Sequence, residues 1–470
     1  MYRRGRAAQL ALVCLASAYL QKQCSVLAIH PEELARARPS RARTSCCRRR
    51  DTEDTVPRRI LYNINHVKLV SDEVPLLLSL GYEVYIPKHL PANIDYATSS
   101  GVINKFDKSL SISRKARALL DAHNFYDEKS WGSDSDELAR VIDGNFCMVI
   151  TAAYSTPVVV FLNRLSIPVG IRAFGHAVPM TYSASFSPEA KELILAHKGC
   201  RCFFLSAYAH LAEVEKELKD IFLFAPVTLG PESPSFEREV TRNAVLFQCS
   251  RVNVSPYYTE KANKFLADFG SSGMDVAMYG TELAKFNDTH NLGRLSTREI
   301  SRLFSSYSAM YYDSVEPRHL HYHPLEAMYA RMPVVFLQQG MLARLMPYSP
   351  AKSRDVGDAQ RKLRRLVEGD VDFEAEIVWH QNALLQTLKR SNTVHEWRAV
   401  LSRVGCKSRR ESGCEARERP RSPRGCRESI LLDTQRLHGG GKGASAISGA
   451  AATTAAVATR TTVAQNRPLS

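Results

Sequence analysis

Several common signatures of nucleotide and metal chemistry are missing from this sequence. The turn after the first predicted strand lacks the GxGxxG pattern that seats a dinucleotide pyrophosphate, which disfavours nicotinamide and flavin dehydrogenases. The 11 cysteines include no pair with the spacing of a zinc ribbon or of a redox CxxC motif. Neither a dinucleotide-dependent redox enzyme nor a zinc-ribbon protein is therefore favoured.

The central part of the chain has no excess charge of either sign, although the whole chain of 470 residues carries +15. Residues 1–59 hold 13 basic against 5 acidic side chains, and residues 406–470 hold 12 against 5. The two ends supply the whole excess, so residues 60–405 are formally neutral. A nucleic-acid enzyme would place basic residues on its folded part. The sequence therefore predicts no nucleic-acid partner.

The N-terminus has the outline of a secretory signal peptide. Arginines stand at positions 3, 4 and 6, an apolar run follows from Ala7 to Leu20, and no acidic residue precedes Glu32. The run is shorter than the roughly 20 residues of a bilayer span. We therefore predict the secretory pathway (endoplasmic reticulum and Golgi), entered by a signal peptide or by an N-terminal membrane anchor. A plastid or cytoplasmic location is the alternative.

The two ends of the chain are predicted to lie outside the fold. Residues 1–57 are assigned to targeting and disorder. Residues 406–470, rich in Arg, Ser and Pro and then in Gly, Ala and Thr, have too few large apolar side chains to pack. The cysteines of these ends are Cys14, Cys24, Cys46, Cys47, Cys406, Cys414 and Cys426. The others, Cys147, Cys200, Cys202 and Cys249, lie in strand-like segments, and Cys200 and Cys202 are interpreted as small buried side chains.

Between the ends, strands and helices alternate in the manner of an α/β protein with two Rossmann-like domains. The first domain, residues 58–228, has predicted strands at 58–64, 83–86, 146–151, 168–172 and 201–205. Its first predicted helix follows the first strand and is closed by Gly81. The other predicted helices cover 113–123, 136–142, 156–165, 188–197 and 206–219. A Pro-rich linker, 224–236, precedes the second domain, 240–405. There we predict strands at 244–248, 275–278, 308–312 and 333–337, and helices at 257–269, 297–304, 324–330, 358–367 and 372–404.

The most informative stretch lies in the second domain. The strand ending at Tyr312 is followed by a loop and by a helix predicted to begin at Pro324, a residue suited to a first helical turn. The helix N-terminus would face the carboxyl edge of the sheet, where such folds bind ligands and where helix N–H groups favour an anion. Glu316 and Glu326 bracket this position. Arg318, His319, His321 and His323 lie between them.

This stretch resembles the donor-binding segment of GT-B glycosyltransferases, especially the large retaining family four. The matching residues are Glu326, Ala327, Met328, Pro333, Val334 and Val335. The resemblance implies two domains with a cleft between them and a last helix that crosses back to the first domain. It also implies transfer of a hexose-like sugar, with retention, from a UDP- or GDP-sugar to a glycan, lipid or protein. No metal and no other cofactor would be needed.

The resemblance also implies roles for single residues on the donor side. Arg251, at the end of the first strand of the second domain, matches an arginine that meets the donor diphosphate. Glu326 would accept the ribose hydroxyls, and Glu316 would accept a sugar hydroxyl in the catalytic centre. Arg318, His319 and His323 are further candidates for donor binding.

Two histidines are candidates for the acceptor side. His66 follows the first strand of the chain. His176 follows Gly175 in the segment IPVGIRAFGHAVP, which resembles a strand that ends beside a histidine at the interdomain cleft. His176 is also the candidate catalytic histidine.

The sequence departs from the family pattern at three places. Nine residues instead of seven separate Glu316 and Glu326, Arg331 stands where the family has a helix-ending glycine, and no lysine follows Arg251 at the usual distance. Lys261 and Lys264, on the next predicted helix, are poor substitutes. A degenerate protein that binds a nucleotide-sugar or glycan, or a GT-B sugar-nucleotide epimerase, is therefore the alternative function.

The alternating histidines permit one further interpretation. On an extended segment His319, His321 and His323 would share one face and could hold a metal. The resemblance favours hydrogen bonds to a diphosphate or sugar instead.

Overall fold

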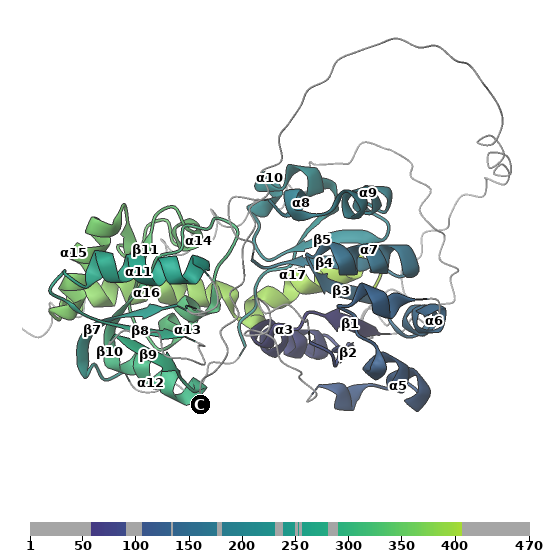
Figure 1. The fold of residues 1–470 in the computed structure, drawn as a ribbon, viewed down its shortest axis with the longest axis horizontal. Coiled ribbons are helices and arrows are strands. Elements are labelled where there is room, and N and C mark those ends of the chain that lie inside the picture. The colour runs from purple at the N-terminus through teal and green to yellow at the C-terminus, as the bar shows by residue number, and fades with distance from the viewer. Residues whose placement is uncertain are drawn as a thin grey trace, which may run out of the picture. The chain divides into compact units, whose positions relative to one another are not determined.

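The computed structural model describes residues 58–90, 106–132, 135–175, 181–230, 238–249, 252, 256–280 and 290–406. Within them the chain forms two six-stranded sheets with helices packed on their faces (Figure 1). The fold class predicted from the sequence, α/β with two Rossmann-like domains, is confirmed. The predictions for residues 1–57 and 407–470, and for residues 231–236 of the linker, lie outside the described residues. The first part of the predicted linker is described, and residues 225–229 are buried.

The first sheet has the strand order β2-β1-β3-β4-β5-β6, and all its neighbouring strands are parallel. Every residue of β3, β4 and β5 is buried. Helices cover both faces of a parallel sheet, so its strands are apolar throughout instead of alternating. The strands are β1 (Arg59–Asn63), β2 (Glu83–Tyr85), β3 (Met148–Ala152), β4 (Val169–Ala173), β5 (Cys202–Ser206) and β6 (Phe222–Phe224).

The helices of the first domain follow the predicted segments closely, except for the predicted helix 206–219, described below, and for the short helix Tyr182–Ser185, which was not predicted. Gly81 closes α3 with a φ of 88°, a left-handed conformation that glycine adopts without steric cost. The α-helices are α3 (Val67–Ser79), α5 (Arg114–Ala122), α6 (Ser135–Asn145), α7 (Ser155–Arg164), α8 (Tyr182–Ser185), α9 (Pro188–Ala196) and α10 (Leu211–Val214). The 3₁₀ turns are η1 (Asp107–Ser109), η2 (Glu128–Trp131) and η3 (Lys216–Ile221).

The second sheet has the order β12-β11-β10-β7-β8-β9 and is also parallel. Its central strand β10 is buried along its whole length. The sequence analysis missed β9 and β12, which are short edge strands. The strands are β7 (Arg242–Gln248), β8 (Asp275–Gly280), β9 (Asn291–Arg294), β10 (Tyr307–Tyr312), β11 (Val334–Leu337) and β12 (Lys352–Ser353).

Helices α11 (Pro256–Phe269), α12 (Thr297–Ser306), α13 (Tyr322–Tyr329), α14 (Met341–Leu345) and α15 (Val356–Val367) accompany this sheet. Ser296 and Glu299 form a reciprocal capping box at the start of α12. The short α14 was not predicted. None of the described helices combines the length and the apolar character needed to cross a membrane.

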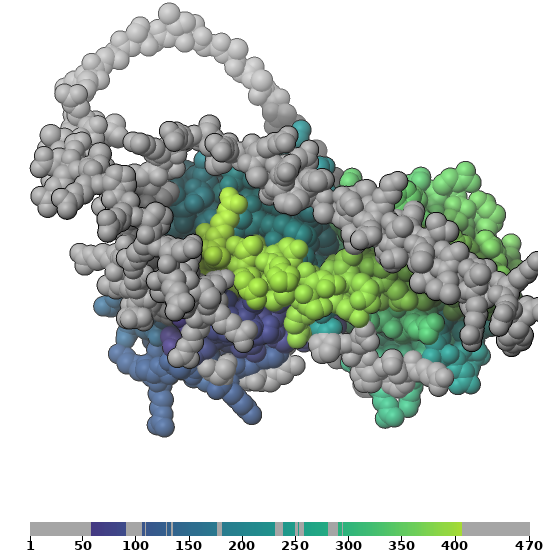
Figure 2. Space-filling view, turned by 180° about the vertical axis from the view of Figure 1, so that it is seen from behind, coloured from purple at the N-terminus to yellow at the C-terminus, as the bar shows by residue number. Residues whose placement is uncertain are grey.

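The C-terminal segment returns to the first domain, as the sequence predicted. The single predicted helix 372–404 is two helices, α16 (Val371–Leu388) and α17 (Arg390–Arg403), because Lys389 leaves the helical conformation with a ψ of 142°. Trp397 of α17 is fully buried, and its indole N–H donates to the carbonyl of Pro226 at 3.0 Å. Figure 2 shows this C-terminal segment in yellow-green against the first domain.

Cys406 belongs to the fold, which corrects its assignment to the C-terminal tail. Its side chain is fully buried and forms a disulfide with Cys147, 259 positions earlier in the chain. The hydroxyl of Tyr82 also donates to the carbonyl of Cys406. A short sequence motif could not reveal this pairing, because the docking of α17 brings the two cysteines together. Cys202 is buried, as predicted. Cys200 was predicted to be buried on the same strand, but it is only half-buried and precedes β5, which begins at Cys202.

The predicted helix 206–219 is wrong. Ser206 is the last residue of β5, paired with Ala173 on one side and Phe224 on the other. After it the chain forms only the short α10 and η3, because Glu215 between them has non-helical dihedrals of −93° and 62°. The carboxylate of Glu215 instead accepts the backbone N–H groups of Tyr182 and Ser183 at 3.0 and 3.1 Å.

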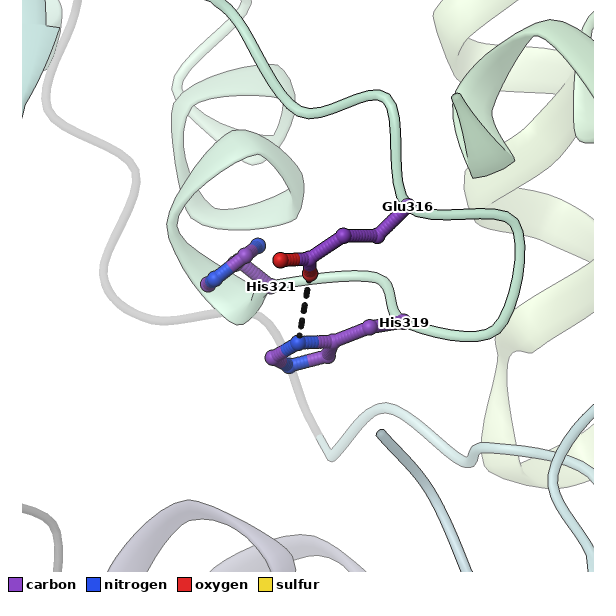
Figure 3. Close-up of side chains that lie close together, drawn as sticks. All are labelled: Glu316, His319 and His321. Carbon is purple, nitrogen blue, oxygen red and sulfur yellow. Dashed lines mark hydrogen bonds and ion pairs between the residues drawn. The ribbon is translucent and has the colours of Figure 1, made fainter. Parts of the chain in front are cut away.

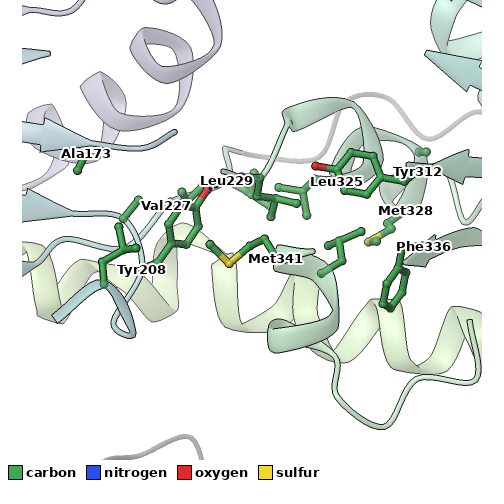
Figure 4. Packing of buried hydrophobic residues seen from close by; sticks show 14 of the residues in the cluster. Ala173, Tyr208, Val227, Leu229, Tyr312, Leu325, Met328, Phe336 and Met341 are labelled. Carbon is green, nitrogen blue, oxygen red and sulfur yellow. Dashed lines mark hydrogen bonds between the residues drawn. The ribbon is translucent and has the colours of Figure 1, made fainter. Parts of the chain in front are cut away.

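One cluster of buried apolar side chains includes residues of both sheets. Tyr208, Val227 and Leu229 of the first domain belong to it together with Leu325 and Met341 of the second (Figure 4). A separate cluster packs the other face of the first sheet against α3 and α17. The larger cluster thus joins the two sheets on either side of the candidate site.

Candidate functional site

The site is built around the segment that joins β10 to α13. Helix α13 begins at Tyr322 with His321 as its N-cap, and Pro324 occupies its first turn. The predicted helix is confirmed, although it starts two residues before the predicted position. Glu326 therefore lies in the second turn, and no acidic residue lies in the first. The side chain of His321 makes no capping hydrogen bond to the helix.

Glu316 points into the protein and only 4% of its surface is exposed. Its Oε2 lies 3.0 Å from Nδ1 of His319 (Figure 3). The His319 ring in turn lies 4.0 Å, centroid to centroid, from the ring of His321. The structure thus brings together two predicted site residues, Glu316 and His319, and a third polar side chain of the same segment, His321.

A tyrosine holds the third member of this group. The hydroxyl of Tyr312, the last residue of β10, lies 2.9 Å from Nδ1 of His321. The backbone N–H of His321 donates to the same hydroxyl at 3.3 Å. Tyr312 is buried, so its hydroxyl fixes both the loop and the orientation of the His321 ring. The sequence analysis assigned Tyr312 only to the buried strand.

His323 is kept neutral by its surroundings. Burial, and next the positive charge of Lys261, lower its pKa to about 3. Lys261 extends from α11 to the end of β10, where its Nζ pairs with Asp313 at 2.9 Å. The sequence analysis discounted Lys261 because it lies on a helix. The packing of α11 against β10, where Phe265 lies beside Tyr311, nevertheless brings its charge close to His323.

Glu326 has a side chain that is 41% exposed, and its nearest basic partner comes from the first domain. Nζ of Lys68 on α3 lies 3.7 Å from Glu326 Oε1 and also 5.8 Å from the ring centre of Tyr322. Lys68 was not among the predicted residues. Nothing in its local sequence distinguishes it from an ordinary helical lysine.

Arg318 was predicted to bind the donor, but its guanidinium lies against the first domain. Its Nε is 3.3 Å from Oε1 of Glu215, and only 12% of its side chain is exposed. Glu215 itself is buried and holds the start of α8, as described above. The ion pair therefore connects the β10–α13 loop to the first domain.

His66 lies at the N-cap of α3, where its Nδ1 accepts the N–H of Leu69 at 3.3 Å. Its ring lies 5.6 Å from that of Phe174 and 5.9 Å from that of Tyr322. Burial, and secondarily the proximity of His319, lower its pKa to about 4. His66 thus caps α3, and its ring lies beside Tyr322 at the start of α13. Its predicted role in acceptor binding stays a prediction.

The carboxyl end of β4 meets the same loop. Gly175 follows β4, and a Cβ added there would lie 2.5 to 3.0 Å from ring atoms of His319. The N–H of Gly175 donates to the hydroxyl of Tyr182 at 2.8 Å. Glycine is required at this position because the backbone and the His319 ring are in direct contact. His176 and Arg251, both predicted site residues, lie outside the described residues.

Tyr208 and His210, which follow β5, also contact the loop between β10 and α13. The hydroxyl of Tyr208 accepts the N–H of Leu320 at 3.3 Å. Nε2 of His210 lies 2.8 Å from the carbonyl oxygen of Pro317. Sequence analysis missed both because it placed them inside the incorrect helix 206–219. Their position directly after a buried strand was the signal that could have identified them.

Comparisons with known proteins support the fold. Neither a protein-family model nor a curated protein matches the sequence. Among solved structures, HepE of Anabaena in complex with UDP and glucose is similar with a TM-score of 0.51 and 13% identity, covering 73% of this chain and 99% of that one. The lipopolysaccharide outer core galactosyltransferase WaaB is similar with a TM-score of 0.46 and 10% identity, covering 73% of this chain and 99% of that one. T4 phage BGT in complex with UDP-glucose is similar with a TM-score of 0.42 and 10% identity, covering 74% of this chain and 98% of that one. The fold is of the GT-B type.

Proposed function

We propose that this protein is a glycosyltransferase that moves a sugar from a nucleotide-sugar donor to an acceptor. The observation that carries the proposal is the meeting of the carboxyl ends of two parallel sheets. The loop after β10 contacts the end of β4 through His319 and Gly175. Ligands of open α/β folds bind at such edges. The likeness to the UDP- and glucose-bound HepE is consistent with a nucleotide-sugar there.

The donor would bind over the start of α13. The N–H groups of its first turn and the positive end of the helix dipole suit a diphosphate. Arg251 is proposed as its charged partner, and Lys261 is close enough to His323 to add positive charge. Glu326 would accept the ribose hydroxyls. Lys68, 3.7 Å away, would orient the Glu326 carboxylate.

The reaction would proceed by stabilisation of the leaving group. Cleavage of the bond between the anomeric carbon and the diphosphate oxygen leaves negative charge on the diphosphate and positive charge on the sugar ring. Glu316 would accept a hydroxyl of a hexose-like sugar and hold the ring in place. The acceptor oxygen then bonds to the anomeric carbon, with retention as the resemblance implies, and its proton passes to the departing diphosphate oxygen. His176 is proposed to lie at this centre, and no metal is required for the transfer.

The acceptor would be a glycan, a lipid or a protein, approached from the first domain. We further propose that the protein works in the secretory pathway. The disulfide between Cys147 and Cys406 supports this location, because such bonds persist in oxidising compartments. A cytosolic location would keep both thiols reduced.

Calorimetric titration with UDP, GDP and the matching nucleosides tests the donor site. Glu326→Gln keeps the side-chain shape but replaces charge-assisted hydrogen bonds of roughly 1.5 to 3 kcal/mol. Nucleoside and nucleotide affinity should both fall about 10- to 100-fold. Arg251→Ala should weaken the nucleotide more than the nucleoside. Glu376→Gln, an exposed glutamate of α16, is the matched control and should change neither. The assigned roles would be contradicted if Arg251→Ala weakened nucleotide and nucleoside binding equally, as Glu326→Gln is expected to do, or if neither variant changed either affinity.

Turnover distinguishes transfer from the alternatives. The protein is incubated with radiolabelled UDP- and GDP-sugars, first without acceptor and then with candidate acceptors. A glycosyltransferase releases free sugar slowly and forms product with its acceptor. An epimerised nucleotide-sugar would identify an epimerase, and binding without turnover would identify a degenerate binding protein.

A further inference from the structure

The group formed by Glu316, His319 and His321 has a property that sugar transfer does not use. One oxygen or nitrogen atom of each side chain lies within 4.8 Å of the corresponding atoms of the other two. Figure 3 shows the Glu316 carboxylate beside the two imidazole rings, joined to His319 by a hydrogen bond. Two histidines and one carboxylate are a common ligand set for a single divalent transition ion.

The distances suit such an ion. Metal–ligand bonds of about 2.0 to 2.1 Å in a tetrahedron place neighbouring ligand atoms about 3.3 Å apart. Oε2 of Glu316 and Nδ1 of His319 are 3.0 Å apart. An inward movement of at most about 1.5 Å, shared among the three side chains, brings the remaining ligand distances into the same range.

Groups behind the ligands orient two of them. The Tyr312 hydroxyl lies 2.9 Å from Nδ1 of His321 and fixes the orientation of that ring. Metal-bound histidines are held through their second ring nitrogen in this way. Gly175 packs directly against the Cδ2 and Nε2 edge of the His319 ring. That contact directs Nδ1 of His319 toward Glu316.

We infer that Glu316, His319 and His321 bind one divalent transition ion of the Zn²⁺ class. Two imidazoles and one carboxylate suit Zn²⁺ or Co²⁺, whereas Mg²⁺ and Ca²⁺ require oxygen ligands. Three protein ligands leave a fourth position for water or for another small ligand. Glu316 is also assigned to the sugar in the proposed reaction, so the test below is carried out without any sugar and its outcome does not depend on transfer.

Cobalt spectroscopy tests the site. The full chain, without a histidine tag and dialysed against a chelator, is titrated with Co²⁺ while visible d–d absorption is recorded. We expect saturation at one equivalent and loss of the band when Zn²⁺ displaces the cobalt. His319→Ala and His321→Ala should weaken Co²⁺ binding at least 10-fold. His395→Ala, an exposed histidine of α17, is the matched control and should bind as the unmodified protein does.

Substitution of residues that contact the ligands gives a second test in which all three ligands are kept. Tyr312→Phe should weaken Co²⁺ binding about 10- to 100-fold while preserving the shape of the band. Gly175→Ala should have a similar effect, because its Cβ would displace the His319 ring. Circular dichroism confirms that each variant is folded. A missing band at one equivalent, or a band that survives His319→Ala combined with His321→Ala, would show that these residues form only a hydrogen-bonded cluster.

Discussion

Arg172 and Glu73 form an ion pair inside the first domain, and neither side chain has any exposed surface. The guanidinium Nε donates to Glu73 Oε1 at 3.1 Å, and the hydroxyl of Tyr62 donates to Oε2 at 2.6 Å. Arg172 also donates to the carbonyls of Leu205 and Ala225. The pair therefore joins α3 to β1, β4 and β5 behind the candidate site.

Removal of one partner should strongly destabilise the first domain. Glu73→Gln leaves the Arg172 charge buried without its counter-ion, which typically costs about 3 to 5 kcal/mol. Urea unfolding measures the change. Asp220→Asn, which breaks an exposed pair with Lys198, is the control and should cost less than about 1 kcal/mol. A small effect of Glu73→Gln would mean that water or another group compensates the charge.

Replacement of Asp72 should stabilise the protein at neutral pH. Burial raises the pKa of Asp72 to about 6, although Lys68 and the N–H of Gly230 partly oppose the rise. Because the folded pKa lies above the unfolded value, the aspartate favours folding below pH 4, and this contribution is lost as pH rises through 6. Asp72→Asn should therefore gain up to about 3 kcal/mol at pH 7.5.

Thermal unfolding of the Asp72→Asn variant and of the unmodified protein, at several pH values from 4 to 8, checks this sign. The stability difference should grow between pH 4 and 7 and then remain constant. A difference independent of pH would show that the carboxyl group does not titrate in this range.

Replacement of Arg331 tests the left-handed end of α13. Arg331 has a φ of 60°. Its N–H donates to Met328 and that of Met332 donates to Ala327, the two bonds of a Schellman motif. Arg331→Gly should relieve steric cost and stabilise the protein by up to about 1 kcal/mol. Arg331→Ala keeps the Cβ and should have little effect. Chemical denaturation of both variants separates backbone relief from loss of the arginine side chain.

The disulfide should stabilise the attachment of α17. Cys147→Ser and Cys406→Ser should each lower the free energy of unfolding by about 2 to 4 kcal/mol under oxidising conditions. The double variant should match the single ones, since either substitution removes the same bond. A reductant should bring the unmodified protein to the same level. Additive losses would indicate that the cysteines contribute through packing alone.

The sequence by itself determined the elements whose signals are local. Alternating apolar segments and turn residues predicted the main strands of both domains. Arg331, which stands where the family has a helix-ending glycine, follows the end of α13 with a left-handed φ of 60°. Pro324 and the apolar segments around it were sufficient to predict α13. These features depend on residues within one or two turns of each other.

Only the tertiary structure decided which distant groups meet. The inward orientation of Glu316, the contact of His319 with Gly175 and the approach of Lys68 to Glu326 each join separate elements. The pairing of Cys147 with Cys406 likewise depends on α17 docking against the first domain. No local pattern encodes such contacts, because they arise when two sheets bury a shared apolar cluster and thereby fix which loop side chains face each other.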